Sequence, residues 1–360
     1  MIKIGFIGAG SVANIHKLAI DRLKDVFVSS IVKKDNETIW ERCAELGINC
    51  YHKNIESMLE DPEIKAVHCL LPNYMHYRVV KDAIGKGKHV LAEKPHTISL
   101  EQSLSLVKIA KQTNLVCSIN YRYRYYPAIQ ELRKYVLSGK LGTVYFIQGT
   151  FFQDWLSNEK DFNWRLLPEA SGKSATLTDI GSHVLDLIQY ITGQRINRLF
   201  AHLKTIIPFR QNKINSESNI HINLDDYSNI IFETEKGITG SIIVSQVATG
   251  SGMSNLSIEI IGSKKTITWH REKPEFLFYK YRDKNNEVIC FDDNKNLSWE
   301  HGIIKLMEAF YWDVLAHIKG REHEKCYSYP SFEDGYRSMK LLDAALESHR
   351  TETWVKVEYN

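Results

Sequence analysis

Apolar runs and amphipathic stretches alternate along the first 120 residues of the chain. Short apolar runs predict buried strands at 2–7, 27–32, 66–71, 89–92 and 116–119. Stretches with apolar residues three and four positions apart predict helices at 12–23, 37–46, 77–84 and 99–113. Strands that alternate with helices in this way indicate an α/β domain, a parallel sheet with helices on both faces.

The pattern changes after Asn120. Long β runs dominate from there, and the segments 234–237 (TEKG) and 261–265 (IGSKK) read as hairpin connections, so a mostly antiparallel sheet is expected. The predicted strands are 144–152, 198–207, 219–224, 228–234, 238–247, 256–261, 265–270 and 276–281, and the predicted helices are 127–138, 176–192, 303–319 and 332–348. We therefore expect two domains, an α/β domain over 1–120 and an α+β domain with a large open sheet over 121–360.

Composition and charge exclude several classes of protein. The chain has 360 residues, 43% of them hydrophobic, and a net charge of +3. This near balance of charge gives no case for a nucleic-acid or anionic-membrane partner. No apolar run approaches the roughly 20 residues of a membrane span. The first strand begins at the second residue with no leader before it, and the six scattered cysteines form no CxxC pair, so a cytoplasmic protein with reduced thiols is expected.

A glycine-rich loop follows the first predicted strand. Residues 8–13, GAGSVA, match the GxGxxA pattern between a strand and a helix. Gly8 allows the tight turn, Gly10 lets the backbone approach a pyrophosphate, and the N–H groups of Ser11 and Val12 at the helix start can bind the phosphates. In this context the loop predicts a Rossmann domain that binds a dinucleotide; a glycine turn without a ligand is the alternative.

The end of the second predicted strand bears on the choice of cofactor. NAD-binding domains carry an acid about 20 residues after the glycine loop, where this chain has Lys33. Lys33 and Lys34 suit the 2′-phosphate of NADP, whereas Asp35 could serve NAD if the strand ended later. Two solvated loop charges are the plain alternative. NADP is slightly favoured over NAD.

Lys94 stands directly after the apolar strand 89–92, between Glu93 and Pro95. In an open α/β sheet, ligands bind at the carboxyl ends of the strands, so Lys94 and Gly8 can face the same ligand. A lysine that merely ends a strand is the alternative. We favour a functional role because Glu93 can pair with the ammonium and Pro95 restricts the turn.

Asp179 and His183 lie four residues apart on a predicted helix, so their side chains are expected to meet. A carboxylate beside an imidazole orients its tautomer and raises its basicity. A surface Asp–His pair is the plain alternative. A metal site is a third, but no further ligands can be located at matching positions, and none is predicted.

Two aromatic and basic segments are candidates for binding a polyhydroxylated ligand. The segment 120–127, NYRYRYYP, includes Tyr121 and Arg122, and the segment 162–172 includes Trp164 and Arg165. Aromatic faces pack on the C–H surfaces of sugars, so these residues could line a substrate site. Nucleic-acid stacking by 120–127 is disfavoured by the balanced charge of the chain. A packed tryptophan beside a surface arginine is the alternative for the second segment.

With Gly8, Gly10, the EKP sequence at 93–95 and the DxxxH pair 179/183 in this order, the chain resembles the glucose–fructose oxidoreductase, inositol dehydrogenase and rhizopine-catabolism (Gfo/Idh/MocA) family. Segments 70–95 and 329–348 resemble its central block and its C-terminal helix. The resemblance covers nearly the whole chain and implies hydride transfer between NAD(P) and a hydroxyl or carbonyl carbon of a sugar, polyol or derivative. It also implies an open sheet used in a homodimer or homotetramer.

The resemblance assigns roles to individual residues. Lys94 matches the catalytic lysine, Asp179 its acidic partner and His183 the proton-transferring histidine. Positions near the cofactor are matched by Asn73, His76, Glu93 and Asn120, and the segment entering the substrate site by Asn120 and Arg122. His96 departs from the family pattern, in which an apolar residue follows the proline, and has no assigned role.

Three functions are compatible with these features. An NAD(P)-dependent dehydrogenase or reductase acting on CH–OH groups is expected first. The second is a redox-neutral NAD-dependent glycosidase of the same family, and the third is a non-catalytic dinucleotide-binding regulator. Lysine can stabilise negative charge on a reacting oxygen, and histidine, with an ordinary pKa of about 6.5, suits proton transfer. The complete set of Lys94, Asp179 and His183 therefore disfavours the regulator.

Overall fold

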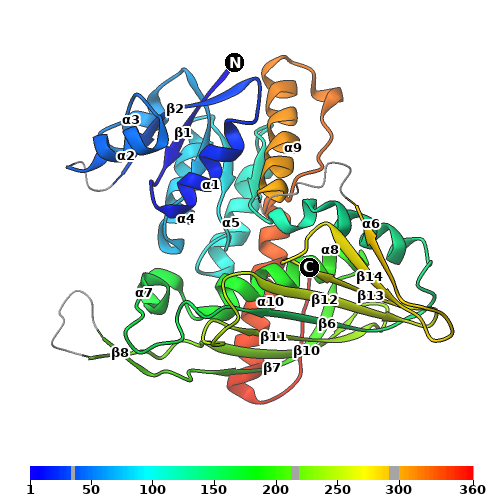
Figure 1. The fold of residues 1–360 in the computed structure, drawn as a ribbon. Coiled ribbons are helices and arrows are strands. Elements are labelled where there is room, and N and C mark those ends of the chain that lie inside the picture. The colour runs from blue at the N-terminus through cyan, green and yellow to red at the C-terminus, as the bar shows by residue number, and fades with distance from the viewer. Residues whose placement is uncertain (34–36, 212–218, 292–299, 360) are drawn as a thin grey trace. The chain divides into compact units, whose positions relative to one another are not determined.

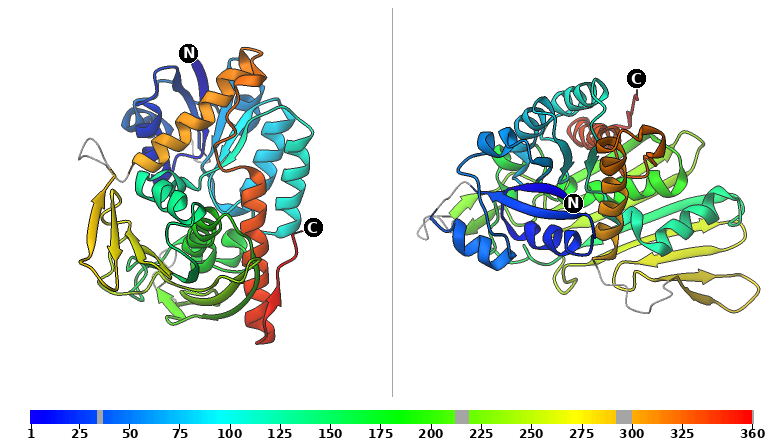
Figure 2. Two further views of the ribbon diagram at one scale, coloured as in Figure 1. Left: turned by 90° about the vertical axis from the view of Figure 1, so that its right-hand side faces the viewer. Right: turned by 90° about the horizontal axis from the view of Figure 1, so that it is seen from above.

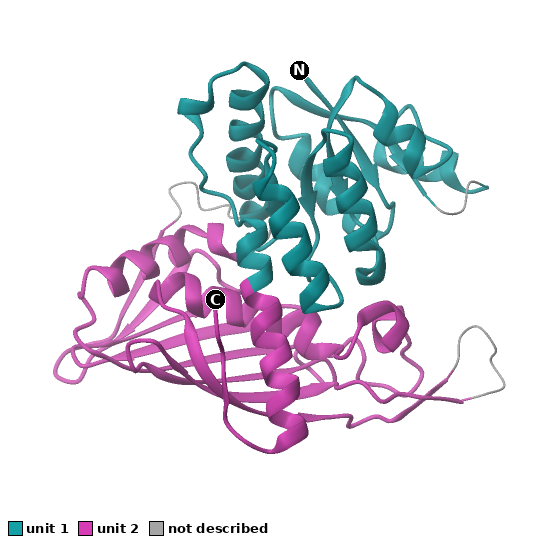
Figure 3. Ribbon diagram, turned by 180° about the vertical axis from the view of Figure 1, so that it is seen from behind, with its two compact units in different colours: residues 1–122, 300–336 teal, residues 123–299, 337–360 magenta. Residues whose placement is uncertain are grey.

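A computed structural model describes residues 1–33, 37–211, 219–291 and 300–359. The chain forms two compact units (Figure 3). Unit 1 comprises Met1–Arg122 and Glu300–Tyr336, and unit 2 comprises Tyr123–Trp299 and Arg337–Asn360. The segment Glu300–Tyr336, which the sequence division places in the second domain, thus groups with unit 1.

Unit 1 contains a five-stranded parallel sheet in the order β2-β1-β3-β4-β5, of which β1 and β2 are labelled in Figure 1. Its strands are β1 (Ile2–Ile7), β2 (Val26–Val32), β3 (Ile64–Cys69), β4 (His89–Ala92) and β5 (Cys117–Ile119). The reversal of strand order at β1 and β3 is typical of dinucleotide-binding sheets. This arrangement confirms the predicted α/β class.

Helices cover both faces of this sheet. They are α1 (Ser11–Ile20), α2 (Ile39–Leu46), α3 (Ile55–Glu60), α4 (Asn73–Gly85), α5 (Leu100–Lys111), α9 (His301–Ile318) and the short η4 (Glu322–Glu324). Val67 and Cys69 of β3 share a buried cluster with residues of α4 and α5, two helices that lie side by side (Figure 2). His68 points to the opposite face, as strand alternation requires, and there contacts side chains of α1 and α9.

Unit 2 is built on a nine-stranded sheet in the order β15-β14-β13-β12-β6-β11-β10-β7-β16. All neighbours are antiparallel except β11 and β6, which confirms the predicted mostly antiparallel sheet. Its strands are β6 (Val144–Phe152), β7 (Ile196–Lys204), β10 (Tyr227–Thr234), β11 (Thr239–Ser245), β12 (Asn255–Gly262), β13 (Thr266–His270), β14 (Phe276–Lys280), β15 (Glu287–Cys290) and β16 (Val355–Lys356). A separate pair, β8 (Phe209–Gln211) and β9 (Asn219–His221), forms a small antiparallel sheet.

One helix of unit 2 packs very closely on this sheet. A Cβ atom on Gly149 of β6 would lie 2.5 Å from Cγ1 of Val184, so only glycine permits this approach of α8 (Ser182–Thr192). The other helical elements are η1 (Arg122–Tyr125), α6 (Pro127–Leu137), η2 (Trp164–Leu166), α7 (Pro168–Ser171), the π-helix η3 (Leu177–Gly181) and α10 (Phe332–Thr351), which begins in unit 1. Among the described residues, no helix combines the length and the apolar character that a membrane span requires.

Candidate functional site

In the glycine loop between β1 and α1, Gly8 has a positive φ and close neighbours, whereas Gly10 faces open space. Gly8 has a φ of +102°, and a Cβ atom there would lie 2.5 Å from the carbonyl oxygen of Leu70, so both its backbone and its surroundings require glycine. A Cβ atom on Gly10 would meet no atom within 4 Å. Ser11 and Val12 are the first residues of α1, where N–H groups lack partners within the helix. The loop therefore fits the close approach of a pyrophosphate.

Arg42 of α2 holds this loop, a role that the sequence did not suggest. Its Nε donates to the carbonyl oxygen of Ala9 at 2.8 Å, and one terminal nitrogen donates to Gly10 O at 3.0 Å and to Asn14 Oδ1 at 2.6 Å. These bonds fix the backbone of the loop from the side. The spacing of 33 residues between Arg42 and Ala9 leaves no local signal for the contact.

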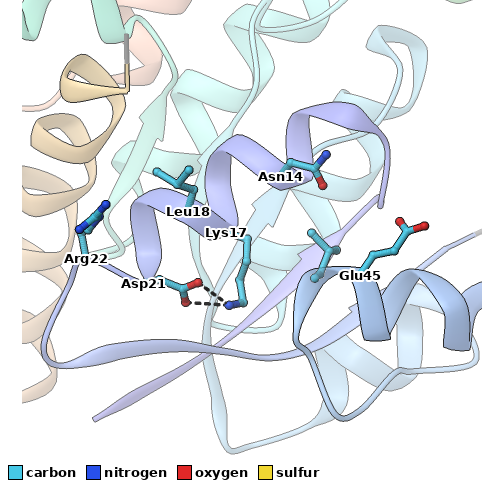
Figure 4. A pocket seen from close by; sticks show the side chains of 7 residues that line it. Asn14, Lys17, Leu18, Asp21, Arg22 and Glu45 are labelled. Carbon is cyan, nitrogen blue, oxygen red and sulfur yellow. Dashed lines mark hydrogen bonds and ion pairs between the residues drawn. The ribbon is translucent and has the colours of Figure 1, made fainter. Parts of the chain in front are cut away.

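A hollow of about 520 Å³ lies on unit 1 beside α1 (Figure 4). It is lined by Asn14, Lys17, Leu18, Asp21, Arg22, Glu45 and Leu46. Lys17 donates to both carboxylate oxygens of Asp21, at 2.7 and 2.6 Å, so its charge is already compensated. The hollow contains none of the residues that the sequence assigns to a cofactor or a substrate, and we give it no part in the function.

Lys33 follows the end of β2. Its Nζ donates to Thr38 Oγ1 at 2.5 Å, which keeps the ammonium near the N-terminus of α2. Lys34 lies outside the described residues. The structure therefore describes one of the two lysines that favour NADP in the sequence.

Glu93 and Asn120 meet where β4 and β5 end. Glu93 Oε1 accepts hydrogen bonds from Asn120 Nδ2 at 2.5 Å and from His16 Nε2 at 2.8 Å, and Glu93 Oε2 lies 3.3 Å from the backbone nitrogen of Lys94. Burial alone would raise the pKa of Glu93. The hydrogen bonds from His16 and Asn120 and the charge of Arg122 outweigh burial and lower that pKa, so the carboxylate is ionised.

Asn120 also presents an acceptor with no partner. Its Oδ1 atom is buried and makes no hydrogen bond among the described residues, although Asn120 is only 1% exposed. A buried polar atom without a partner is destabilising unless a ligand or water supplies one. Together with the open side of Gly10, this atom fits a ligand that carries both phosphates and an amide or hydroxyl donor, as a nicotinamide dinucleotide does.

Two histidines support the turn that follows Lys94. His76 Nδ1 lies 2.9 Å from Pro95 O and its Nε2 lies 2.8 Å from Leu71 O, so His76 links two strand ends. Asn73 is the first residue of α4 and is 7% exposed. His96 is fully buried, its Nδ1 lies 2.6 Å from Ser103 Oγ, and its ring packs on Phe332.

Burial, followed by the neighbouring His76, lowers the pKa of His96 to about 3. The imidazole is therefore neutral at physiological pH, when a proton acceptor with an ordinary pKa would be titrating. His96 fills space between the turn and the start of α10, where a Cβ atom on Gly335 would already lie 2.9 Å from its ring. This accounts structurally for the residue that has no role in the sequence reasoning.

In unit 2, Asp179 lies within the π-helix η3 and is held by two donors from distant segments. Arg165 Nε donates to Oδ1 at 3.2 Å, and Gln246 Nε2 donates to Oδ2 at 2.7 Å. Thr176 Oγ1 donates to Gln246 Oε1 at 3.0 Å and so orients the amide. Gln246 is fully buried at the end of β11, and no sequence motif marks it.

The segment that leads into η3 is capped by a buried carboxylate. Asp225 accepts bonds from the backbone nitrogens of Ala175 and Leu177, both at 2.8 Å, and from the hydroxyls of Ser174 and Ser228, both at 2.7 Å. Backbone N–H groups at a helix start need such acceptors. Asp225 therefore fixes the start of the helical segment that carries Asp179 and His183.

His183 lies in the first turn of α8 and is 4% exposed. Its ring packs edge-on against Tyr123, with 4.6 Å between the ring centroids. One turn further along, Asp186 receives two bonds from Arg124, from Nε at 2.9 Å and from a terminal nitrogen at 2.5 Å. His183 and Asp186 of α8 therefore both contact side chains of η1 within unit 2.

The residues predicted to bind substrate have different environments. The Arg165 guanidinium lies over the Trp164 ring, 4.4 Å from its centroid, and bonds to Asp179, so this pair adjoins the Asp179 cluster. Tyr121 is 1% exposed, which makes its ring part of the core. Arg122 begins η1, and its charge lowers the pKa of Glu93.

A Rossmann unit with a dinucleotide-type glycine loop, and an ionised carboxylate beside a lysine at the strand ends, define a nicotinamide-dependent oxidoreductase. Residues 2–121 match the model of an oxidoreductase family with an NAD-binding Rossmann fold, and residues 129–268 match the C-terminal domain model of the GFO/IDH/MocA family. The chain belongs to the Gfo/Idh/MocA oxidoreductase family.

Several named proteins are similar to the chain over nearly its full length. Glucose-6-phosphate 3-dehydrogenase of Bacillus subtilis is 26% identical over 96% of both chains. Levoglucosan dehydrogenase of Pseudarthrobacter phenanthrenivorans is 25% identical over 99% of this chain and 98% of that protein. The solved structure of a levoglucosan dehydrogenase in complex with NADH has a TM-score of 0.90 and 25% identity, with 99% of each chain covered.

Proposed function

We propose that the chain transfers a hydride between a nicotinamide dinucleotide and a hydroxyl or carbonyl carbon of a sugar, polyol or sugar derivative. The observation that carries this proposal is the arrangement at the strand ends of unit 1, where Glu93 fixes Asn120 and the backbone of Lys94. Relatives along the full length of the chain are named as dehydrogenases of glucose 6-phosphate and levoglucosan, which supports a carbohydrate substrate.

The residues divide the remaining work. Lys94, a cation with three donors, holds the reacting oxygen and stabilises negative charge on it. His183 accepts the proton of the hydroxyl. Asp179 orients the imidazole of His183 and is itself fixed by Gln246 and Arg165. Gly8, Gly10 and the start of α1 hold the pyrophosphate, and Asn73, His76 and Asn120 shape the neighbouring part of the cofactor site. The bound nicotinamide supplies the hydride acceptor or donor.

A substrate screen tests this proposal. Cyclic polyols, aldoses, amino sugars, anhydro sugars and sugar phosphates are each incubated with NAD and with NADP, and the ultraviolet absorbance of the reduced nicotinamide is followed. We expect a net rise with at least one compound, and no rise with Lys94→Met protein under the same conditions. Consumption of a glycoside without any net change in nicotinamide absorbance would contradict the proposal and indicate redox-neutral chemistry.

We propose, more specifically, a preference for NADP(H) over NAD(H). The support is Lys33 at the end of β2, where NAD-binding sheets carry an acid. Charge-assisted bonds contribute about 1.5–3 kcal/mol, so Lys33→Asp should shift the ratio of the two dissociation constants towards NAD by about tenfold or more. Lys24→Asp makes the same charge reversal just before β2 and should leave the ratio unchanged. A wild type that favours NAD, with no shift in Lys33→Asp, would refute the preference.

We also propose that copies of the chain associate through the outer face of the nine-stranded sheet. That face exposes two apolar side chains, Phe146 of β6 and Ile231 of β10, each 45% exposed. Light scattering after size-exclusion chromatography should give a dimer or tetramer mass; a monomer would contradict this proposal.

The six cysteines are free thiols, in keeping with the cytoplasmic location that we propose.

A further inference from the structure

Buried polar side chains form a continuous line of hydrogen bonds across unit 1, from α9 to the end of β4. Tyr311 OH lies 2.6 Å from His68 Nε2. His68 Nδ1 lies 2.8 Å from His16 Nδ1, and His16 Nε2 lies 2.8 Å from Glu93 Oε1. His16 and His68 are fully buried and Tyr311 is 2% exposed. The function proposed above assigns no role to His16, His68 or Tyr311.

The positions of the protons in this line follow from its acceptor end. Ionised Glu93 has no proton to give, so His16 Nε2 must carry the hydrogen of their bond. If His16 is neutral, its Nδ1 is then an acceptor, and His68 Nδ1 must donate to it. Burial keeps the pKa of His68 well below its ordinary value, so His68 Nε2 in turn has no proton and accepts from Tyr311. Every N–H and O–H group in the line then donates to an acceptor.

The opposite arrangement leaves one donor unused. If His16 carried a second proton, it would donate to His68, and His68 Nε2–H would donate to the Tyr311 oxygen. The Tyr311 hydroxyl hydrogen would then have no acceptor among the described residues, since the hydroxyl faces His68 Nε2, which would itself be a donor. Leaving a buried donor unsatisfied is unfavourable. The count of hydrogen bonds therefore favours neutral histidines with Tyr311 as the terminal donor.

The line ends on the groups that the proposed function requires. The oxygen of Glu93 that accepts from His16 also accepts from Asn120 Nδ2, at 2.5 Å. The other oxygen lies 3.3 Å from the backbone nitrogen of Lys94. The amide of Asn120 also lies 3.4 Å from His16 Nε2, but both nitrogens are donors here, so we count no bond between them. The direction of the Glu93 carboxylate thus sets the orientation of Asn120 and the start of the Lys94 turn.

We propose that Tyr311, His68 and His16 form a proton-ordered chain of hydrogen bonds that fixes the Glu93 carboxylate, and that through Glu93 this chain positions Asn120 and Lys94 for hydride transfer. The three are positioning residues, because each acts through Glu93. The effect on turnover rests on the proposed function. The proton order does not, so it can be tested on the protein without cofactor or substrate.

Nitrogen-15 NMR of the histidine rings tests the proton order directly. We expect His16 to be the Nε2–H tautomer and His68 the less common Nδ1–H tautomer, with His16→Gln and His68→Gln proteins identifying the signals. Tyr311→Phe should leave His68 as the Nδ1–H tautomer, because His16 Nδ1 still requires its donor, but should shift the His68 Nε2 signal, because that nitrogen loses its hydrogen bond. An Nε2–H tautomer of His68 in the wild type would overturn the proposed order.

Kinetics test the positioning. Tyr311→Phe removes one hydroxyl and keeps the ring that stacks on His68, so the fold should be retained. We expect kcat to fall about tenfold while the KM and the dinucleotide dissociation constant stay nearly the same, because small misplacements of reacting groups lower rates strongly. Tyr329→Phe is the matched control. The ring of Tyr329 also contacts Phe310 of α9, but its hydroxyl is not part of the line of hydrogen bonds, so this variant should leave kcat unchanged.

Variants of His16 separate positioning from stability. His16→Leu should lower kcat about a hundredfold, and His16→Gln, whose amide can still donate to Glu93, should recover part of that loss. An unchanged kcat in Tyr311→Phe, or equal losses in His16→Leu and His16→Gln, would overturn the positioning role. If no substrate is turned over by the wild type at all, the proposed function fails, while the NMR result still decides the proton order.

Discussion

Replacing Lys94 by methionine should lower kcat by about 10²–10⁴-fold and leave the dissociation constant of the dinucleotide nearly unchanged. Methionine keeps an unbranched stem but has no charge and no donor, so the reacting oxygen loses its stabilising cation. The glycine loop and α1, which are proposed to hold the pyrophosphate, lie elsewhere on the strand ends and are not altered. Steady-state kinetics together with a fluorescence titration of the reduced cofactor measure both quantities.

The control for this variant lies near the other end of the same strand. Lys86→Met makes the same chemical change just before β4, at a residue whose ammonium pairs with Glu60 on the surface. Surface pairs contribute little, so kcat should stay at the wild-type value. A normal kcat in Lys94→Met, with both proteins folded, would contradict the role of Lys94.

The effects of replacing Lys94 and His183 should not be additive if the proposed mechanism is correct. His183→Ala should also lower kcat by about 10²–10⁴-fold, and the double variant should be little worse than either single one. Asp179→Asn should have a comparable or smaller effect, since it weakens the orientation of His183 and leaves the imidazole. Additive losses, or a wild-type pH profile in His183→Ala, would assign proton transfer to another group.

Gly10→Val should weaken dinucleotide binding by roughly ten- to hundredfold, because overpacking of this size costs about 1–3 kcal/mol where the pyrophosphate must approach. The side chain itself has room, since no atom lies within 4 Å of the Cβ position, so the melting temperature should change little. Calorimetric titration and thermal unfolding measure the two effects.

Two other glycines make this result specific. Gly8→Val should lower stability as well as affinity, because its φ of +102° and its contact with Leu70 O exclude a side chain. Gly85→Val, at the end of α4, also points into open space and should leave affinity unchanged. Wild-type affinity in Gly10→Val would refute the assignment of the glycine loop.

Much of the fold is predictable because its signals are local. The strands 89–92 and 144–152 have the predicted bounds, since an uninterrupted apolar run and a long β run each end at a change of pattern. The helix expected from Tyr77 begins four residues earlier, at Asn73, because Pro72 sets its start and because Asn73 and His76, two polar residues of its first turn, are buried. The short helix Ile55–Glu60, capped by Asn54, is too brief to show a periodicity.

The candidate site could be predicted only where its residues lie in recognisable motifs. Lys94 and the Asp179–His183 pair follow from such motifs, but the π-helix that carries Asp179 has no pattern of its own. The partners that fix these groups are separated by 67 residues, for Asp179 and Gln246, and by 77, for His16 and Glu93. Hydrogen bonds between positions so far apart follow from tertiary packing and leave no local trace in the sequence.

The cap formed by Asp225 affects the order in which parts of the protein can fold during synthesis. During synthesis, residues 174–177 leave the ribosome about 50 residues before the carboxylate that accepts their N–H and O–H groups. Until that strand region arrives, the start of the helical segment bearing Asp179 and His183 lacks its acceptor. Proteins fold during synthesis as units become complete, so this segment should reach its final geometry only after the chain has been made through Asp225.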